Sequence, residues 1–190
     1  MKDPVIVFAP GAGAPSRSDW MKGWTHRLGT LGPVVPFDYR YQIERRPRPD
    51  PLPALVARHR QAVAEARLHH PGPVVLAGKS MGSRVGCHAS LEEPVDALVC
   101  FGYPLRAAGS GQLRDEVLLR LRTPILFVQG TRDPLCPLPL LEALRPRMTV
   151  RNDLHVVDGG DHSLRVSKKL PQAPVDDDVL AAVASFLASL

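Results

Sequence analysis

Short apolar runs recur along the whole chain, and each one is followed closely by Gly, Pro or Asp. The runs are four or five residues long, are rich in Val, Ile or Leu, and occupy residues 5–9, 34–37, 74–77, 97–101, 125–128 and 154–157. Continuous apolar runs of this length are typical of strands that are buried on both faces, as in a parallel sheet. We therefore expect about six parallel strands.

Amphipathic stretches separate these runs. Apolar residues fall on one face at helical spacing at positions 52–66, 138–144 and 179–190. Asp176, Asp177 and Asp178 precede the last pattern, where we expect them to cap the helix and complement the positive end of its dipole rather than to bind a metal. Alternating strands and helices predict a doubly wound α/β fold, with residues 1–190 forming a single domain.

Several classes of protein are excluded by the composition. No apolar run approaches the roughly 20 residues of a membrane-spanning helix, and the first run is too short for the core of a signal peptide. Cys87, Cys100 and Cys136 are odd in number and widely spaced, which favours a reduced, cytoplasmic protein without disulfides or a Cys-x-x-Cys metal site. A net charge of +5, scattered along the chain, does not indicate nucleic-acid binding.

The third apolar run leads into Gly-Lys-Ser-Met-Gly at 78–82, and a helical pattern follows. A Gly-x-Ser-x-Gly sequence between a strand and a helix is typical of a nucleophilic serine, here Ser80, on a tight, strained turn. The backbone N–H of Met81, at the start of the helix, is then placed to bind an oxyanion. The overlapping alternative is a phosphate-binding Gly-x-x-x-x-Gly-Lys-Ser loop, which needs glycine where the chain has Pro73.

Two further polar residues follow later strands. Asp133 comes after the fifth apolar run in a turn-like sequence, and His162 lies in a glycine-flanked loop after the sixth. Serine, aspartate and histidine in this chain order match the catalytic triad of the α/β-hydrolases, and we expect all three at one edge of the sheet. Asp158 and Asp161 are alternatives to Asp133, although Asp161 would need an awkward local bend to reach the neighbouring ring.

A glycine-rich turn at 10–15 follows the first apolar run. In a hydrolase, a backbone N–H of this turn supplies the second oxyanion donor, and we assign it to Ala12. The alternative is a dinucleotide-binding Gly-x-Gly-x-x-Gly with Asp38 as the acid that binds the ribose. Ser16 occupies the third glycine position of that motif, and this interpretation leaves Ser80 and its partners unexplained.

Together these segments resemble the α/β-hydrolase superfamily, in a minimal form that begins at the superfamily's third strand. More narrowly, they are similar to the small dienelactone-hydrolase-like branch that includes testis-expressed protein 30 and a subunit of the nonspecific lethal chromatin complex. One departure is proline-glycine at 10–11, where many relatives have histidine-glycine, although backbone donation from Ala12 survives it. The matching segments are 8–13, 78–84, 100–105, 127–134 and 159–163.

The resemblance implies a serine hydrolase of carboxylesterase or thioesterase type. It implies Ser80 as nucleophile, His162 as base, Asp133 as the acid that orients it, and oxyanion donors at Ala12 and Met81. We expect a small acyl substrate, no metal or organic cofactor, and neither nucleic acid nor a membrane as partner. The alternatives are a non-catalytic binding or scaffold module on the same fold, and a nucleotide-binding α/β protein.

Other residues near these motifs have alternative interpretations. Lys79 is either a cation near the site or a side chain packed under the turn, whereas Arg84 and Cys136 are expected to be structural. The basic segment 40–49 is expected to be a solvated loop, with attraction of an anionic substrate or partner as the alternative.

The segment 102–122 occupies the position where many hydrolases carry a lid. It is only about twenty residues long, a length at which we expect no separate lid domain. One short helix is predicted near 114–119, and the site is expected to be shallow and open.

Overall fold

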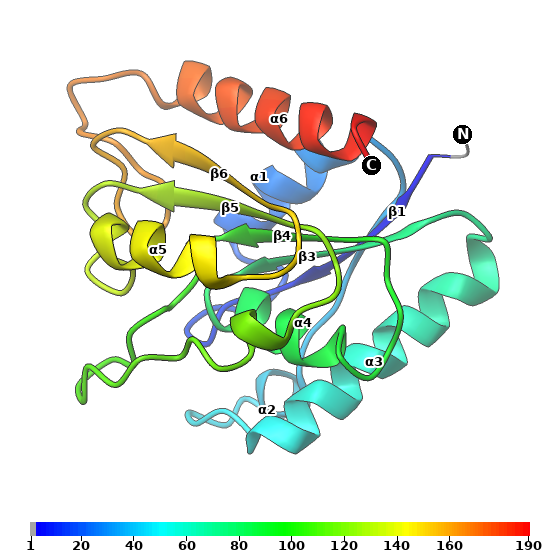
Figure 1. The fold of residues 1–190 in the computed structure, drawn as a ribbon. Helices are drawn as coiled ribbons and strands as arrows, with labels where there is room; N and C mark the ends of the chain where they lie inside the picture. Colours follow the sequence, from blue (N-terminus) through cyan, green and yellow to red (C-terminus); the bar gives the residue numbers. More distant parts are fainter. Residues whose placement is uncertain (1–2) are drawn as a thin grey trace.

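The computed structural model describes residues 3–190, which contain a single sheet of six parallel strands (Figure 1). The order across the sheet is β2-β1-β3-β4-β5-β6, and each adjacent pair is parallel. The predicted α/β architecture is confirmed, and no separate lid domain is present in the described residues. The strands are β1 Val5–Ala9, β2 Val34–Pro36, β3 Val74–Lys79, β4 Ala97–Phe101, β5 Ile125–Gly130 and β6 Asn152–Val157.

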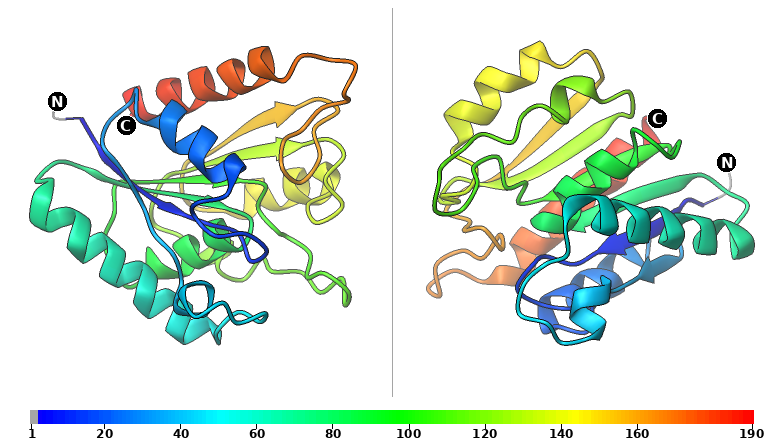
Figure 2. Two further views of the ribbon diagram at one scale, coloured as in Figure 1. Left: turned by 180° about the vertical axis from the view of Figure 1, so that it is seen from behind. Right: turned by 90° about the horizontal axis from the view of Figure 1, so that it is seen from below.

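Helices cover both faces of the sheet (Figure 2). One face carries α1 (Asp19–Leu28) and α6 (Gln172–Ala188). The other face carries α3 (Leu52–His69), α4 (Met81–Ala89) and α5 (Leu138–Leu144). No helix within residues 3–190 is both long enough and apolar enough to span a lipid bilayer. Three single-turn elements lie in the connections, namely α2 Arg40–Ile43 and the 3₁₀ turns η1 Leu118–Arg120 and η2 Arg145–Arg147.

The side chains of successive strand residues pack in the two cores on opposite faces of the sheet. In β1, Val5, Val7 and Ala9 pack in the cluster that faces α3, α4 and α5, whereas Ile6 and Phe8 pack in the cluster that faces α1 and α6. All five are buried. Because helices cover both sides, neither face of the central strands has to be polar, which explains the continuous apolar runs in the sequence.

The predicted start of the last helix is wrong. The helix begins at Gln172, so Asp176, Asp177 and Asp178 lie inside it and do not cap its first turn. Asp176 instead forms an ion pair with Arg27 of α1 (Nη2 to Oδ2, 3.1 Å). Asp176 therefore helps to join the two helices on this face of the sheet.

The predicted helix near 114–119 is also wrong, because only the η1 turn forms there. The backbone N–H of Arg114 donates to the carbonyl oxygen of Leu105 (2.8 Å), and the hydroxyl of buried Tyr103 donates to the carbonyl oxygen of Arg114 (2.9 Å). These bonds use the backbone groups of Arg114 that a helix would need. The segment 102–122 is thus a loop held to the core.

The strand order creates a crevice beside β1 and β3. The connection that leaves β1 runs to β2 on one side, whereas the connection that leaves β3 runs to β4 on the other side. In open α/β sheets, ligand sites form where neighbouring connections diverge in this way, outside the carboxyl ends of the strands. Both the glycine-rich turn and Ser80 follow strands that end at this point.

A histidine is buried where α3 packs on α4. His59 is fully buried, its Nδ1 lies 3.3 Å from the Tyr39 hydroxyl, and its Nε2 has no hydrogen-bond partner among residues 3–190. Burial, together with the charge of Arg58, lowers the pKa of His59 to about 3. The imidazole is therefore neutral in the folded protein at neutral pH.

This burial predicts a dependence of stability on pH. Below about pH 6.5 the unfolded chain binds a proton at His59 that the folded chain does not accept until about pH 3. As the pH falls through this window, His59 should therefore lower the free energy of unfolding by about 1.4 kcal/mol per pH unit. Urea unfolding across the window should show a shallower slope for His59→Gln than for the wild type. His26→Gln, on the exposed part of α1, is the control, and equal slopes for all three proteins would contradict the assignment.

Candidate active site

Ser80 lies on the turn between β3 and α4 in a strained backbone conformation. Its φ of 51° and ψ of −114° lie in a region that residues with a side chain rarely adopt. Its N–H donates to the carbonyl oxygen of Phe101 in β4 (2.9 Å), and the Ser83 hydroxyl donates to the Ser80 carbonyl oxygen (2.6 Å). These bonds hold the turn at the carboxyl edge of the sheet.

Gly78 and Gly82 leave no space for a side chain on either side of Ser80. A Cβ on Gly78 would lie 2.4 Å from a backbone nitrogen of α4. A Cβ on Gly82 would lie 2.6 Å from the carbonyl oxygens of Ala9 and Pro10. Glycine is required at both positions because the backbones approach so closely. The second contact seats the start of α4 on the end of β1.

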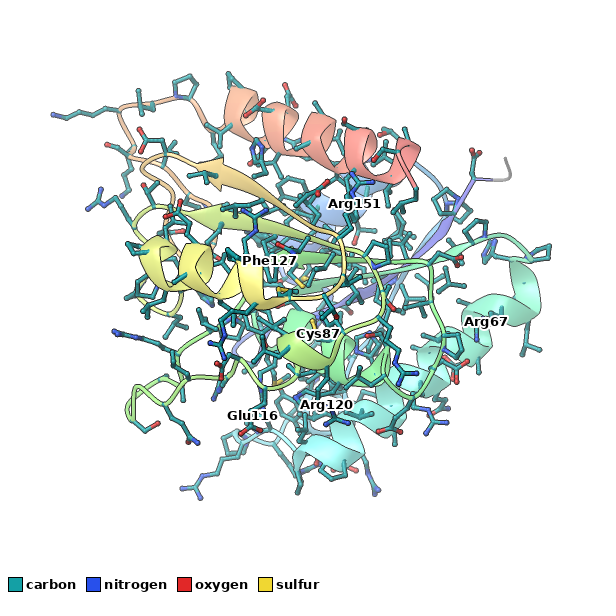
Figure 3. The ribbon with its side chains drawn as sticks, viewed as in Figure 1. Arg67, Cys87, Glu116, Arg120, Phe127 and Arg151 are labelled. Carbon is teal, nitrogen blue, oxygen red and sulfur yellow. The ribbon has the colours of Figure 1, made fainter. Side chains whose placement is uncertain are left out.

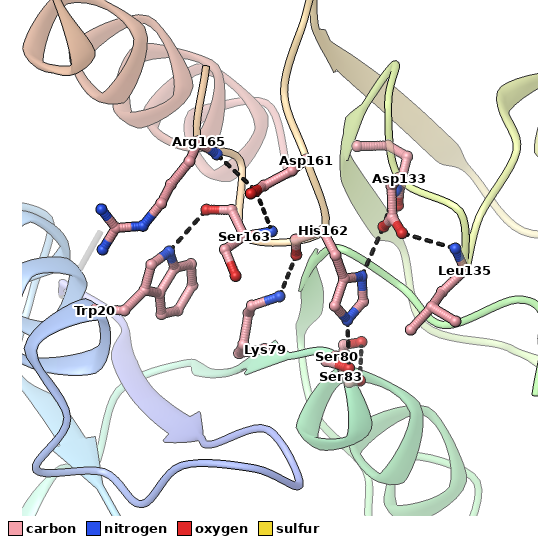
Figure 4. Close-up of polar contacts among 11 residues, drawn as sticks. Trp20, Lys79, Ser80, Ser83, Asp133, Leu135, Asp161, His162, Ser163 and Arg165 are labelled. Atoms are coloured by element: carbon pink, nitrogen blue, oxygen red, sulfur yellow. Dashed lines mark hydrogen bonds and ion pairs between the residues drawn. The ribbon is translucent and has the colours of Figure 1, made fainter. Parts of the chain in front are cut away.

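The structure brings Ser80, His162 and Asp133 together in one row (Figure 4). The Ser80 Oγ lies 2.7 Å from Nε2 of His162, and Nδ1 of the same ring lies 2.7 Å from Oδ2 of Asp133. Both distances are those of strong hydrogen bonds. Asp133 follows β5 and His162 follows β6, so three residues that are distant in sequence meet because their strands end at one edge.

The carboxylate of Asp133 is buried and has several donors besides the imidazole. The side-chain amide of Gln129 donates to Oδ2 (2.6 Å), and the N–H of Leu135 donates to Oδ1 (2.8 Å). Burial raises the pKa of Asp133, but the bond to His162, the charge of that ring and these two donors outweigh burial and hold the pKa below its usual value. The group is therefore a carboxylate that accepts from Nδ1–H of His162.

Neither of the other candidate acids hydrogen-bonds to the imidazole. Asp161 Oδ1 accepts two backbone N–H groups of its own loop, at 2.7 and 3.0 Å. Asp158 accepts from the hydroxyl of Thr131 (3.3 Å). Of the three aspartates weighed from the sequence, Asp133 is the one that contacts the ring of His162.

The loop that carries His162 is held by its main chain. The buried ammonium of Lys79 donates to the carbonyl oxygen of His162, and the indole N–H of Trp20 donates to the carbonyl oxygen of Ser163 (2.9 Å). The Lys79 Nζ also lies 5.5 Å from the centroid of the Trp20 ring. Burial lowers the pKa of Lys79 to about 8 despite two nearby carboxylates. Lys79 is thus a buried side chain that anchors the histidine loop.

The glycine-rich turn is held by the short helix α2. The side-chain amide of Gln42 donates to the carbonyl oxygens of Gly11 (2.9 Å) and Ala14 (3.2 Å), and the Tyr41 hydroxyl donates to that of Ala12 (2.9 Å). With its carbonyl groups held in this way, the turn keeps its backbone beside the serine. The residues of α2 belong to the segment 40–49, which the sequence predicts to be a solvated loop.

The basic side chains of this segment are partly neutralised within it. Arg40 and Arg46 both pair with Glu44, at 2.6 and 2.7 Å, and Arg46 also pairs with Asp50 at 2.5 Å. The segment therefore carries less free positive charge than its sequence suggests, which weakens the alternative that it attracts anions.

The features that suggested a nucleotide site have other roles. Asp38 Oδ1 accepts the backbone N–H of Ser16 (2.6 Å), so this carboxylate helps to close the glycine-rich turn. The residues that a phosphate-binding loop would need form β3 instead. Val74–Lys79 is a buried strand that pairs with β1 and β4, so it does not form a loop around a phosphate. These contacts leave the nucleotide-binding interpretation without a site.

A cavity of about 290 Å³ opens beside Ser80 and His162. Its walls come from the glycine-rich turn, including Ala12, and from Trp20, Met21 and Lys79. Another cavity, of about 470 Å³, lies at the opposite end of the sheet and includes none of these residues. The smaller cavity is the one in which a bound molecule would meet the serine.

Sequence reasoning missed several residues that hold the site. Gln129 lies near the end of β5, is fully buried and contacts the carboxylate of Asp133. Its only signal in the sequence is a polar residue directly after an apolar run. Trp20 and Gln42 lie in segments without a recognisable motif. Cys136 is fully buried in the core, as expected.

The tight contact at Gly82 predicts a matched pair of glycine substitutions. Gly82→Ala should lower the free energy of unfolding by about 1–3 kcal/mol, because its methyl group collides with two carbonyl oxygens that cannot move freely. Gly23→Ala, in an open position of α1, should instead raise it by roughly 0.5–1 kcal/mol through helix propensity. Urea unfolding measures both changes, and a stabilised Gly82→Ala protein would contradict the close approach.

Comparisons with known proteins agree with this fold. Three of the solved structures that are similar in fold are the following. A serine hydrolase homologue from Coxiella burnetii has 17% identity and a TM-score of 0.77, with 97% of this chain and 85% of that chain covered. A dienelactone hydrolase from Anabaena variabilis has 20% identity and a TM-score of 0.70, with coverage of 98% and 84%. A thioesterase of the prodiginine pathway from Streptomyces coelicolor has 20% identity and a TM-score of 0.70, with coverage of 97% and 90%.

The sequence itself matches a family model described as an alpha/beta hydrolase domain over residues 2–189. The match covers nearly the whole chain, and the chain therefore belongs to the α/β-hydrolase family.

Proposed function

We propose that this hydrolase cleaves carboxylic esters or thioesters by acyl transfer to Ser80. The observation that supports the proposal is the row of two 2.7 Å hydrogen bonds from Ser80 through His162 to Asp133. A serine hydroxyl is a weak nucleophile until a neighbouring base accepts its proton, and the base needs a third group to orient it. In this chain the three groups have the distances that such a proton transfer requires.

In the first step, Nε2 of His162 takes the proton of the Ser80 hydroxyl while Oγ attacks the carbonyl carbon of the substrate. Nδ1–H of His162 stays bonded to Asp133, which selects the tautomer with a free lone pair on Nε2 and stabilises the imidazolium that forms. Gln129 and Leu135 hold the carboxylate in place during this change of charge.

The negative charge that develops on the carbonyl oxygen needs hydrogen-bond donors. We assign these to the backbone N–H groups of Met81 and Ala12. Met81 is the first residue of α4, where N–H groups have no intrahelical partner and the helix dipole is positive. Ala12 lies in the turn that Gln42 and Tyr41 hold next to Ser80. The proton on His162 then passes to the leaving group, and a water molecule hydrolyses the acyl-enzyme by the same route.

The cavity supports a small acyl substrate. Its volume of about 290 Å³ lies near the lower end of ligand pockets, and Trp20 and Met21 give it an apolar wall. The choice of carboxylic esters or thioesters as substrates is part of the proposal, as is membership of the branch that includes testis-expressed protein 30. A cytoplasmic location stays a prediction of the cysteine content.

Removal of the nucleophile gives the direct test. Ser80→Ala should lower kcat for p-nitrophenyl acetate or butyrate by roughly 10³-fold or more, with unchanged unfolding free energy within about 0.5 kcal/mol. A fluorophosphonate probe should label the wild type and the Ser90→Ala control, since Ser90 lies at the far end of α4, but not Ser80→Ala. Labelling or hydrolysis that survives in Ser80→Ala would reject the mechanism, and absence of both in the wild type would favour a non-catalytic module.

The carboxylate gives a second test. Asp133→Asn keeps the shape of the side chain but favours the imidazole tautomer that cannot accept the serine proton, and kcat should fall by about 10⁴-fold. Asp161→Asn is the matched control, because its side-chain oxygen can still accept the two backbone N–H groups. Its kcat should stay within about threefold of the wild type, since Asp161 does not contact the imidazole. An equal loss in both variants would contradict the role of Asp133.

A further inference from the structure

A third cavity lies against α4, on the side of the loop 102–122. Its volume is about 300 Å³, which is about ten times the volume that one water molecule occupies in the liquid. Arg84 and His88 of α4 form one wall, and Arg114 and Glu116 of the loop form the other. It shares no lining residue with the cavity beside Ser80.

Neither arginine of this cavity forms an ion pair with another described residue. Within residues 3–190 no carboxylate lies within 4.0 Å of the guanidinium of Arg84 or Arg114, whereas eight of the other seventeen arginines have such a partner. Burial, followed by the charge of Arg84, lowers the pKa of Arg114. Two guanidinium groups that repel each other in a partly buried place cost free energy unless an anion binds between them.

Two buried polar atoms in the same place also have no partner. The Nε of Arg84 and the Nε2 of His88 are inaccessible to solvent and make no hydrogen bond with any described residue. Buried polar atoms are almost always hydrogen-bonded in folded proteins, so two unpartnered ones behind the same wall of a cavity are informative, although a bound molecule would meet the other nitrogens of these side chains. Because Arg84 and His88 are four residues apart on α4, they lie on the same face of the helix.

Charged groups of both signs lie near His88. Burial, Arg84 and Arg120 lower the pKa of His88 to about 4, whereas Glu92 acts in the opposite direction. Figure 3 shows Glu116 and Arg120 on the same side of the molecule. Glu116 lines the cavity but is exposed and pairs with neither arginine. The imidazole is therefore neutral and has one N–H to donate.

The two walls are held firmly enough to form a site. Arg84 and His88 project from a helix that packs on β3 and on α3. The backbone of Arg114 is fixed by the bonds to Leu105 and Tyr103 described above. A ligand would thus meet side chains whose main chain is already in place, which lowers the entropy lost on binding.

We propose that Arg84, Arg114 and His88 form a binding site for an oxyanion, either a phosphate or a carboxylate group, separate from the pocket beside Ser80. Guanidinium groups match the planar or tetrahedral arrangement of oxyanion oxygens, and each can donate two hydrogen bonds. The ligand is either a free anion or the acidic end of a substrate, since Arg84 lies only one helical turn from Ser80. The sequence-based expectation that Arg84 is purely structural does not account for its unpaired guanidinium.

Binding of inorganic phosphate tests the site without any assay of activity. Titration of the wild type, followed by NMR of the His88 ring, should show saturable binding and a higher pKa of His88 in the complex, because an anion favours the imidazolium. Arg114→Gln should weaken phosphate binding by roughly tenfold or more, as loss of a charge-assisted hydrogen bond predicts. It should also raise Tm without phosphate, because it removes the repulsion from Arg84.

Arg106→Gln is the matched control, because Arg106 is exposed in the same loop and does not line the cavity. It should bind phosphate as the wild type does. The proposal would be overturned if the His88 signal showed no saturable change, or if Arg114→Gln and the wild type bound phosphate with equal affinity. The cavity would then hold only water. This outcome is independent of labelling at Ser80, so the site and the proposed hydrolase activity can fail separately.

A pair of substrates distinguishes the two sources of the anion. If the site binds the acidic end of a substrate, phosphate should compete with a monoester of a dicarboxylic acid, and Arg114→Gln should raise KM for that ester but not for a neutral ester of equal length. If the site binds a free anion, phosphate should bind with the same affinity in the presence of either ester. Both results support an oxyanion site.

Discussion

The start of α4 rests directly on the end of β1, and the geometry of the site depends on this contact. A methyl group at Gly82 would lie 2.6 Å from two carbonyl oxygens of β1 and the turn after it, so only a bare backbone allows the approach. Two residues earlier, Ser80 has a positive φ, and its hydroxyl lies at the sheet edge beside His162. The strain at Ser80 is held by the packing of α4 on β3 and β1 rather than by the turn alone.

The sequence was sufficient to predict the sheet, because helices cover both faces of its strands. The bounds of β1 and β4 are those of the apolar runs, while β3 and β5 continue two residues further, into the glycine and polar residues at the sheet edge. The meeting of Ser80, Asp133 and His162 could also be predicted, since the carboxyl ends of parallel strands lie at one edge of the sheet. The start of α6 could not. Three adjacent aspartates resemble the residues that cap the start of a helix, but the helix begins before them, at Gln172, directly after Pro171.

The residues that hold the site were beyond sequence reasoning for a physical reason. Trp20 and Lys79 donate to carbonyl groups of the histidine loop that are far away along the chain, and no local pattern marks such a bond. Gln129 resembles any polar residue at the end of a strand until its partner, Asp133, is known. The cluster of Arg84, His88 and Arg114 likewise depends on how the loop 102–122 folds back, and that segment was predicted to contain a helix.

The histidine loop is anchored to α1 and β3 through its peptide groups. Lys79 and Trp20 both donate to main-chain oxygens, which every amino acid at positions 162 and 163 would present. The side chain at position 163, which borders the cavity, is therefore free to vary without loss of the anchor. Evolution could alter the wall that a bound molecule meets while the imidazole keeps its place, so that a new binding preference would leave the row of Ser80, His162 and Asp133 intact.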